Sequence, residues 1–392
     1  MSLRDHYLLD PSVTFLNHGS FGATPRVVFD EYQYWQLEFE RQPVLFVRRA
    51  EGLLDHARSV LGAYWNAPVD DVIYLSNATH AVNIVARSMQ LRPGDEVLTT
   101  DLEYGACDRA WEHELPKRGI TYRKQPIPLP AMSPEAIVEA LWAGVSEKTK
   151  VIYLSHITSG TALTLPVELV CARARTEGIF TVIDGAHVPG HLPIDLQAIG
   201  ADIYTGNLHK WLSAPRGSAF MHVRPEHHPW MEGTIVSWGW VEGSAYRRAD
   251  VSELVNRNQW QGTRDIAPFL AVPAAIAFQQ THGWPDQQAR CHGFAVQALE
   301  EISDRWGEQP LSPVPAADGY PWFVQMVACP LPPVDGQLLK QRMYDEFKVE
   351  APVTTWAGRE FLRLSFQAYN DHHDLERMLT ALDAIVPTVR VK

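Results

Sequence analysis

The sequence predicts an α/β protein with a mostly parallel mixed sheet, followed by a smaller α+β part at the carboxy terminus. Two observations support this fold class. Short apolar, β-branched runs alternate with longer amphipathic stretches through the centre of the chain, which is typical of a parallel sheet covered by helices. In the last quarter of the chain, two strand-like runs lie between helices, which indicates a separate α+β unit.

The expected strands of the larger part are residues 72–75, 96–100, 151–155, 180–184, 201–206 and 219–223. An Ala-rich helix is expected over residues 268–282, and Trp284 and Pro285 mark its end. The smaller part contributes strands at residues 326–329 and 361–365. We therefore expect a large domain of residues 21–284 and a small domain of residues 1–20 and 285–392.

The most informative feature is a carboxylate and a lysine at the ends of two expected strands. Asp184 closes the run at residues 180–184, and Lys210 follows the run at residues 201–206 within TGNLHKW. Open α/β sheets bind ligands at the carboxyl ends of their strands. A lysine with a depressed pKa can form a Schiff base, and a carboxylate can keep a pyridine nitrogen protonated. The pair therefore predicts a site for pyridoxal 5′-phosphate.

A phosphate site is expected where the run at residues 72–75 leads into a helix-like stretch at residues 81–88. Helix amino termini offer free N–H groups and a favourable dipole. The amides of Ala78, Thr79 and His80 and the Thr79 hydroxyl are the candidate donors; a plain helix cap is the alternative. Tyr104 follows the run at residues 96–100, where its ring could stack on a flat cofactor or cap the sheet as a core residue.

Composition limits the other classes of function. The chain has 392 residues, 46% hydrophobic and 20% charged, and its formal net charge of −12 argues against nucleic-acid and anionic-membrane partners. It shows no long apolar run and no secretory leader, so we expect a cytoplasmic protein without a membrane partner. The four cysteines show no Cys-x-x-Cys pair, and the 16 histidines show no His-Glu-x-x-His, so no metal site is expected.

Nine short motifs together resemble the class V aminotransferase family of fold type I pyridoxal phosphate enzymes, most closely its isopenicillin N epimerase-like branch. The motifs are NHGSFG (17–22), SNATH (76–80), DLEYG (101–105), SHITSG (155–160), DGAHVPG (184–190), TGNLHKWL (205–212), VSWG (236–239), QGTRD (261–265) and RLSFQAYN (363–370). They span nearly the whole chain, so the resemblance implies that fold and that cofactor for the entire protein.

The resemblance implies a role for each matched position. Lys210 would form the covalent bond to the cofactor, Asp184 would pair with the pyridinium nitrogen, and His187 would donate to the phenolic oxygen. Tyr104 would stack on the ring, and Thr79 and His209 would bind the phosphate. Thr263 would reach the phosphate of a neighbouring subunit in a homodimer with shared active sites. Arg363 would grip the α-carboxylate of an amino-acid substrate, with Asn17 and His18 approaching the same carboxylate.

The expected reaction begins by removing the proton from the α-carbon of an amino acid or amino-acid conjugate, with Lys210 as base. Return of the proton on the other face is epimerisation, and His18, Tyr104 and His187 are candidates for the second acid. Elimination or decarboxylation of a cysteine S-conjugate is the alternative, in a pocket that Trp238, Trp240 and Trp260 could line. Transamination is less favoured. Desulfuration is less favoured as well, because the cysteine desulfurases of the family that this chain resembles carry a reactive cysteine shortly before the carboxylate-binding arginine, and residues 344–362 contain no cysteine.

Overall fold

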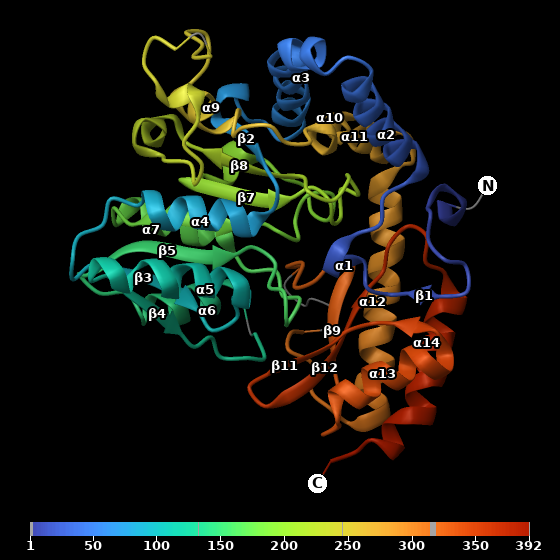
Figure 1. Ribbon diagram of the computed structural model, residues 1–392. Helices are drawn as coiled ribbons and strands as arrows, with labels where there is room; N and C mark the ends of the chain where they lie inside the picture. Colours follow the sequence, from blue (N-terminus) through green and yellow to red (C-terminus); the bar gives the residue numbers. More distant parts are fainter. Residues whose placement is uncertain (1–2, 132, 245, 314–318, 392) are drawn as a thin grey trace.

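The computed structural model describes residues 3–131, 133–244, 246–313 and 319–391 (Figure 1). Its larger part is built on a seven-stranded sheet with the order β2-β8-β7-β6-β5-β3-β4. β8 runs antiparallel to both neighbours, and the remaining pairs are parallel. The strands are β2 (Val72–Leu75), β3 (Glu96–Thr100), β4 (Thr121–Gln125), β5 (Thr149–Ser155), β6 (Phe180–Asp184), β7 (Ile203–Asn207) and β8 (Ala219–Val223). The expected mostly parallel mixed sheet is confirmed.

Alternate residues of each strand enter hydrophobic layers on opposite faces of the sheet. In β2, Ile73 and Leu75 pack with α4 (Ala78–Ser88), α5 (Gly105–Glu114) and α9 (Glu253–Asn258). Val72 and Tyr74 pack on the other face, whose layer includes α6 (Pro134–Trp142), α7 (Val167–Thr176) and α8 (Leu196–Ile199). Side chains of a strand alternate in this way, so a strand covered on both faces must be apolar throughout.

The smaller part holds an antiparallel sheet of order β11-β12-β9, formed by β9 (Met326–Pro330), β11 (Val353–Trp356) and β12 (Arg359–Ser365). The long helix α12 (Trp284–Trp306) runs from the larger part down to this sheet, where α13 (Gly336–Phe347) and α14 (His372–Ile385) also lie (Figure 1). The chain start joins this region, because β1 (Thr14–Phe15) pairs in parallel with β10 (Val349–Glu350). The exact division into two domains stays a prediction.

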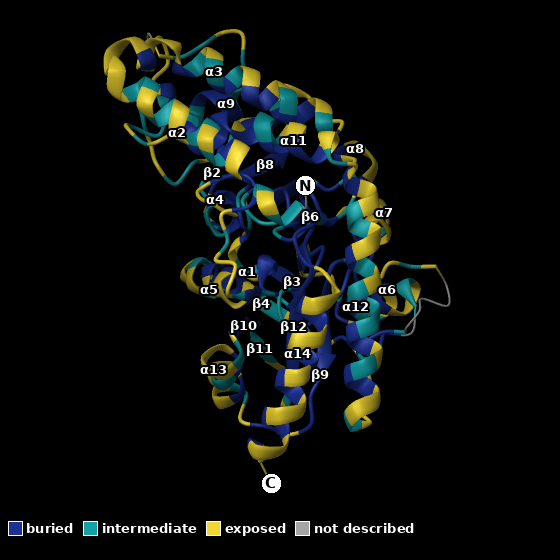
Figure 2. Cartoon of the chain, turned by 90° about the vertical axis from the view of Figure 1, so that its right-hand side faces the viewer, coloured by how far each residue is buried: buried dark blue, intermediate teal, exposed yellow. Residues whose placement is uncertain are grey.

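Four helices pack on one another beside β2, at the end of the molecule opposite the carboxy terminus (Figure 1). They are α2 (Arg26–Arg41), α3 (Pro43–Tyr64), α10 (Ala267–Leu270) and α11 (Val272–Thr281). The short helix α1 (His18–Phe21) precedes them and lies between the two parts (Figure 1). Figure 2 shows that much of α2 is exposed, and Val28 is its buried residue.

Two elements of the larger part differ from the sequence prediction, and the strands β1, β10 and β11 were not expected either. The single helix expected over residues 268–282 is divided into α10 and α11, because Pro273 lies in the first turn of α11 and cannot donate the backbone hydrogen bond that would continue α10. β4 was not expected. It is an edge strand with largely exposed or half-buried side chains, so its sequence lacks the apolar run that identifies a buried strand.

Candidate active site

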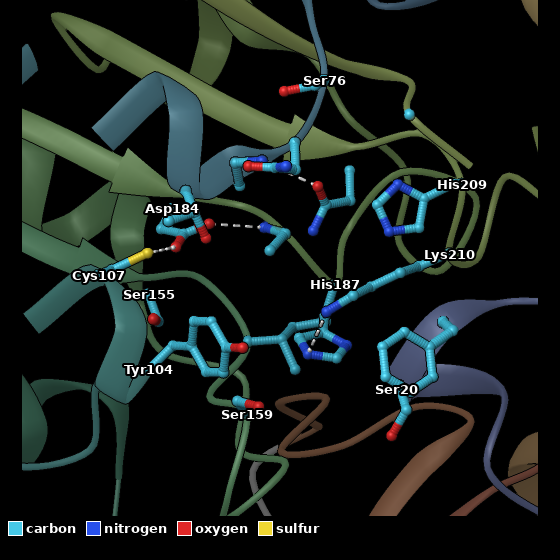
Figure 3. A pocket seen from close by; sticks show the side chains of 18 residues that line it. Ser20, Ser76, Tyr104, Cys107, Ser155, Ser159, Asp184, His187, His209 and Lys210 are labelled. Atoms are coloured by element: carbon cyan, nitrogen blue, oxygen red, sulfur yellow. Dashed lines mark hydrogen bonds between the residues drawn. The ribbon is translucent and has the colours of Figure 1, made fainter. Parts of the chain in front are cut away.

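A cavity of about 330 Å³ lies at the carboxyl ends of β3, β5, β6 and β7, against the first turn of α4 (Figure 3). α1 closes part of its wall. The lining residues are Ser20, Phe21, Ser76, Asn77, Ala78, Thr79, Tyr104, Cys107, Ser155, Ile157, Ser159, Asp184, Ala186, His187, Asn207, His209, Lys210 and Gly217. The cavity thus brings together most of the site residues that the sequence predicts.

Asp184 ends β6 and is 2% exposed. One carboxylate oxygen accepts the Ala186 N–H at 2.9 Å. The other accepts the Tyr153 hydroxyl at 3.1 Å and lies 3.5 Å from the Cys107 sulfur. Burial raises the pKa of Asp184, while the Ala186 amide and the nearby charge of Lys210 oppose that rise. Among the described residues no basic group forms an ion pair with Asp184, so the site has a buried carboxylate that a bound cation would stabilise.

Lys210 projects into the cavity and meets His187, with 3.1 Å between Nζ and Nε2 (Figure 3). Burial lowers the pKa of Lys210 to about 8, and the charge of Arg363 adds to this effect. Burial also holds the pKa of His187 well below its usual value, so the ring is neutral. The Trp211 indole N–H points at Nδ1 of His187 at 3.4 Å, which leaves Nε2 as the nitrogen that carries the hydrogen and can donate to the neutral amine of Lys210.

The first turn of α4 offers fewer free amides than the sequence suggests. The Ala78 amide donates to Asn207 Oδ1 at 2.9 Å, and the His80 amide donates to Asn77 Oδ1 at 2.8 Å as part of the helix cap. The His80 ring contacts the Thr234 hydroxyl at 2.8 Å. Thr79 is therefore the residue of this turn that remains available to a phosphate, by its amide and its hydroxyl.

His209 and Asn207 lie on the cavity wall beside this turn. His209 Nδ1 donates to the Ser218 carbonyl at 3.1 Å, which orients the ring. Asn207 was not expected from the sequence, although it falls inside the motif TGNLHKWL. Its oxygen is occupied by the Ala78 amide, so its carboxamide NH₂ is the group left to donate into the cavity.

Tyr104 is the amino-terminal cap residue of α5, and its side chain is 48% exposed. It and Lys210 enter the cavity from opposite sides (Figure 3). The preceding residue, Glu103, fastens this turn to β5, because its carboxyl accepts the Ser155 hydroxyl at 2.5 Å and the Ser155 amide at 2.9 Å. Burial raises the pKa of Glu103 to about 8. The turn that carries Tyr104 is therefore fixed at the cavity wall.

Arg363 lies on β12 and is 5% exposed. Its Nη1 donates to the Ser159 carbonyl at 2.8 Å, and its Nη2 donates to the Ser20 hydroxyl at 2.8 Å. Burial lowers the pKa of Arg363 to about 10, so it stays charged at neutral pH. Within the described chain it forms no ion pair. Arg363 is not among the lining residues itself, but it contacts the cavity wall through Ser20 and Ser159, which both line the cavity. Neither serine was predicted as a site residue.

Asn17 and His18 do not line the cavity, and their expected contact with the substrate stays a prediction. Asn17 donates to Glu350 at 3.0 Å and accepts from Ser20 at 2.6 Å. His18 is fully buried. Its Nε2 lies 3.0 Å from the Lys210 carbonyl oxygen, and its Nδ1 lies 3.0 Å from the Tyr369 hydroxyl. Hydrogen bonds within the protein engage the polar atoms of both residues, so they hold neighbouring residues of the site in place and do not face the cavity themselves.

Thr263 also lies outside this cavity and is exposed. It lines two separate hollows between α2, α3 and the segment that precedes α10. Its expected contact with a neighbouring subunit stays a prediction. Trp238, Trp240 and Trp260 do not line the cavity either, so they do not form the expected aromatic pocket within this chain. Trp238 is 57% exposed and stacks on Tyr246 with ring centres 5.3 Å apart.

Comparison with known proteins agrees with this geometry. The family model "Aminotransferase class-V" matches residues 23–378. An isopenicillin N epimerase of Amycolatopsis lactamdurans is 35% identical over 390 residues, covering 97% of this chain and 96% of that protein. A putative L-cysteine desulfhydrase of Oryza sativa is 29% identical, covering 96% and 84%. The structure of a cysteine desulfurase from Thermococcus onnurineus superposes with a TM-score of 0.82 at 17% identity, covering 99% and 98%.

The chain therefore belongs to the class V aminotransferase family, and it is an enzyme that uses pyridoxal 5′-phosphate. The cavity fits that cofactor on its own evidence. Asp184 is a buried carboxylate without an ion-pair partner among the described residues, so it can pair with the pyridinium nitrogen of the cofactor. Lys210 has a lowered pKa, as expected for the lysine that bonds the cofactor's aldehyde. The described residues contain no cluster that could hold a metal ion. None of the described helices is long and apolar enough to cross a membrane.

Proposed function

We propose that this enzyme moves the proton on the α-carbon of an α-amino acid or amino-acid conjugate from one face to the other, as an epimerase similar to isopenicillin N epimerase. The observation that carries the proposal is the placement of Lys210 and Tyr104, which enter one cavity from opposite sides. Epimerisation requires a proton acceptor on one face and a proton donor on the other. The 35% identical relative named as an epimerase supports the same reading.

The cofactor would be held by groups on three sides of the cavity. Thr79, Asn207 and His209 would bind its phosphate, Asp184 its ring nitrogen, and His187 its phenolic oxygen. When bound, pyridoxal phosphate accepts the electron pair that is left when the proton leaves the α-carbon. Lys210 would bond the cofactor between turnovers, and the Tyr104 ring would pack on its face.

Arg363 is our candidate for binding the substrate carboxylate. It is a buried cation without a carboxylate partner among the described residues. It contacts Ser20 and Ser159 of the cavity wall, so an anion bound at that wall would stabilise its charge. Its planar guanidinium can donate two parallel hydrogen bonds to a carboxylate. Binding the carboxylate at Arg363 would fix the direction of the α-carbon proton relative to Lys210.

Lys210 would remove the proton from one face of the α-carbon, and Tyr104 would supply a proton to the other face. Because its pKa is lowered to about 8, Lys210 loses its own proton more readily than an ordinary lysine, and Nζ can then take the proton from the α-carbon. Three residues were considered as the second acid. His18 does not line the cavity and contacts the Lys210 carbonyl oxygen, and His187 contacts the Lys210 amine, so it lies on the side of the base. The Tyr104 hydroxyl is the remaining candidate, and it would return a proton to the opposite face.

The second candidate function is C–S bond cleavage of a cysteine S-conjugate, by elimination or after loss of the carboxylate. The desulfhydrase relative favours it, and this reaction needs only Lys210 as base. Transfer of sulfur through an enzyme persulfide is less supported, because all four cysteines are buried and burial raises the pKa of Cys329 and Cys171.

One experiment separates these reactions. The wild type and Tyr104→Phe would be incubated in deuterated water with a panel of amino acids and cysteine S-conjugates, and NMR and chiral analysis would follow the α-carbon. For an epimerase, the wild type scrambles configuration with deuterium uptake, whereas Tyr104→Phe still exchanges the proton but retains configuration. Production of pyruvate, thiol or carbon dioxide without racemisation would instead select C–S cleavage or decarboxylation. Epimerisation by Tyr104→Phe at the wild-type rate would remove Tyr104 from the mechanism.

We also propose a homodimer in which Thr263 of one subunit reaches the phosphate in the other. Support comes from the placement of Thr263, which is exposed and lies outside the cavity of its own chain. The exposed apolar residues of α2 and α3 lie beside it, and such a surface is usually covered by a partner.

A further inference from the structure

Among the described residues, the groups that hold the guanidinium of Arg363 in place are neutral oxygen atoms. Nη1 donates to the Ser159 carbonyl at 2.8 Å and approaches the Ser159 hydroxyl at 3.3 Å, and Nη2 donates to the Ser20 hydroxyl at 2.8 Å. Nε is buried without a partner among the described residues. An arginine held by a carboxylate would have its charge neutralised, whereas this one is oriented and keeps its charge.

Ser20 is itself oriented by Asn17. The Ser20 hydroxyl donates its single hydrogen to Asn17 Oδ1 at 2.6 Å, so only its lone pairs can face Arg363. Asn17 Nδ2 donates to Glu350 at 3.0 Å. This pair of contacts fixes the orientation of the Asn17 amide, because a flipped amide would place its oxygen against the Glu350 carboxylate. Two neutral groups thus separate the Glu350 carboxylate from the Arg363 cation.

The backbone of this segment leaves little room to move. A side chain at Gly19 would approach Met326 Sδ to 2.8 Å and Ser365 Oγ to 2.9 Å, which are atoms of β9 and β12. A side chain at Gly22, whose φ is +68°, would lie 1.9 Å from the His209 carbonyl oxygen. The segment 17–22 is therefore clamped between the strand that carries Arg363 and the loop that carries Lys210.

We propose that Ser20, oriented by Asn17, is a positioning residue that presents Arg363 to the substrate carboxylate without neutralising its charge. The inference rests on the proposed function, since it takes an α-carboxylate as the group that Arg363 binds. Ser20 lies on the cavity wall and β12 holds the arginine from the other part of the molecule. The contact therefore holds the Arg363 guanidinium beside the cavity wall, where its charge can attract the carboxylate.

Propionate is a suitable probe, because it carries the carboxylate but has no amino group to react. Its binding to the cofactor-loaded enzyme would be measured by calorimetry, with propionamide as the uncharged reference. We expect Ser20→Ala to raise the dissociation constant of propionate about tenfold, as a hydrogen bond to a charged group is lost. Asn17→Ala should weaken binding less, and Ser20→Thr, which keeps the hydroxyl, should restore it. For an amino-acid substrate, KM should rise in Ser20→Ala while kcat changes little.

The matched control is Ser12→Ala. Ser12 lies in the same amino-terminal segment, is exposed, and donates to Asp10 at 2.8 Å, so the variant loses a similar hydrogen bond far from Arg363. If Ser20→Ala does not fold, Ser20→Cys carries the same expectation, since sulfur is a weak acceptor. Unchanged propionate affinity in the Ser20 variant, or an equal loss in Ser12→Ala, would overturn the inference.

The outcome can be told apart from failure of the proposed function. If Ser20→Ala loses propionate affinity but the wild type exchanges no α-carbon proton on any amino acid, the proposed reaction is overturned and the role of Ser20 stands. If the wild type exchanges the proton and Ser20→Ala binds propionate normally, the role of Ser20 is overturned and the proposed reaction stands. Failure of the wild type to bind propionate would overturn the role of Ser20 directly.

Discussion

At the scale of single residues, the site depends on charges that the protein holds away from water. Lys210 has neighbours that disfavour its charged form, because burial and the Arg363 charge act together against the single nearby carboxylate, Asp184. Such an arrangement costs stability and supplies reactivity, which is a common compromise in active sites. The cost can be measured, since the pKa of Lys210 differs between the folded and unfolded chain.

The first prediction concerns the pH dependence of that cost in the cofactor-free enzyme. The folded pKa of Lys210 is about 8, and the unfolded value is 10.5. Below both values the wild type carries the full destabilisation. Between them the unfolded chain binds more protons than the folded chain, so stability rises with pH. Lys210→Met should therefore be more stable than the wild type at pH 7, by a margin that disappears as the pH approaches 10.5. Chemical denaturation across this range provides the test, and a margin independent of pH would contradict the assigned shift.

The second prediction concerns Asp184. Asp184→Asn keeps the shape of the side chain, and its single oxygen can still accept from the Ala186 amide while its NH₂ faces the oxygen of the Tyr153 hydroxyl, so the protein should fold. The variant lacks the negative charge that keeps the pyridine nitrogen protonated, so α-carbon proton exchange should fall on the order of 100-fold. Tyr153→Phe, which removes one donor and keeps the charge, is the matched control and should lose less. Exchange at the wild-type rate in Asp184→Asn would remove the residue from its proposed role.

At the scale of elements, the sequence predicts best what is buried on both sides. The strands that end in Ser155 and Asp184 are uninterrupted apolar runs because helices cover both faces, and both were expected within two residues of their observed bounds. The edge strand β4 lacks that pattern, and the break between α10 and α11 follows from Pro273, whose effect was not anticipated. Burial leaves a clear signal in sequence, whereas edges and local backbone breaks leave a weak one.

The same contrast applies to the site. Lys210, Asp184 and Tyr104 were predicted because they follow strands, and strand ends meet at one edge of the sheet, whereas His187 was predicted through the family resemblance. Ser20 and the supporting role of Asn17 were not predicted, since they depend on a contact between the chain start and β12, far apart in sequence. Spacing along the chain does not encode such contacts. The motif NHGSFG marked the segment without showing which of its side chains faces the cavity.

The third prediction tests whether that segment is clamped. Gly22→Ala places a methyl group 1.9 Å from the His209 carbonyl oxygen at a φ of +68°, so the segment or the Lys210 loop must shift. We expect a lower unfolding temperature, measured by thermal denaturation, and a higher dissociation constant for the cofactor, measured by equilibrium dialysis. Gly52→Ala is the control, because this glycine lies in α3 with no atom near the added methyl group. That change should stabilise the protein by about 0.5–1 kcal/mol.

At the scale of the whole molecule, the surface of α2 and α3 is unusually apolar for a free face. Val27, Leu37, Val44, Leu45 and Val47 are all more than a third exposed. Two hollows lie between these helices and the segment that carries Thr263 (Figure 2 shows the exposed helices). Our proposed dimer would cover this face, and an isologous interface would place each Thr263 near the partner's cavity.

The last prediction follows from that geometry, because a shared site can be rebuilt from two defective chains. Lys210→Ala lacks the reactive lysine, and Thr263→Glu places a negative charge where the partner's phosphate is expected, so each homodimer should be inactive. In a mixed dimer one site carries both defects, but the other takes Lys210 and Thr263 from undamaged positions. Equal mixing followed by refolding should therefore restore about a quarter of the wild-type sites. Proton exchange at the α-carbon would report the recovered sites. Mixtures of Lys210→Ala and Asp184→Ala are the control, since those two residues line the same cavity of one chain and mixing cannot restore a site. Recovery in the control mixture, or none with Thr263→Glu, would show that each site is complete within one subunit.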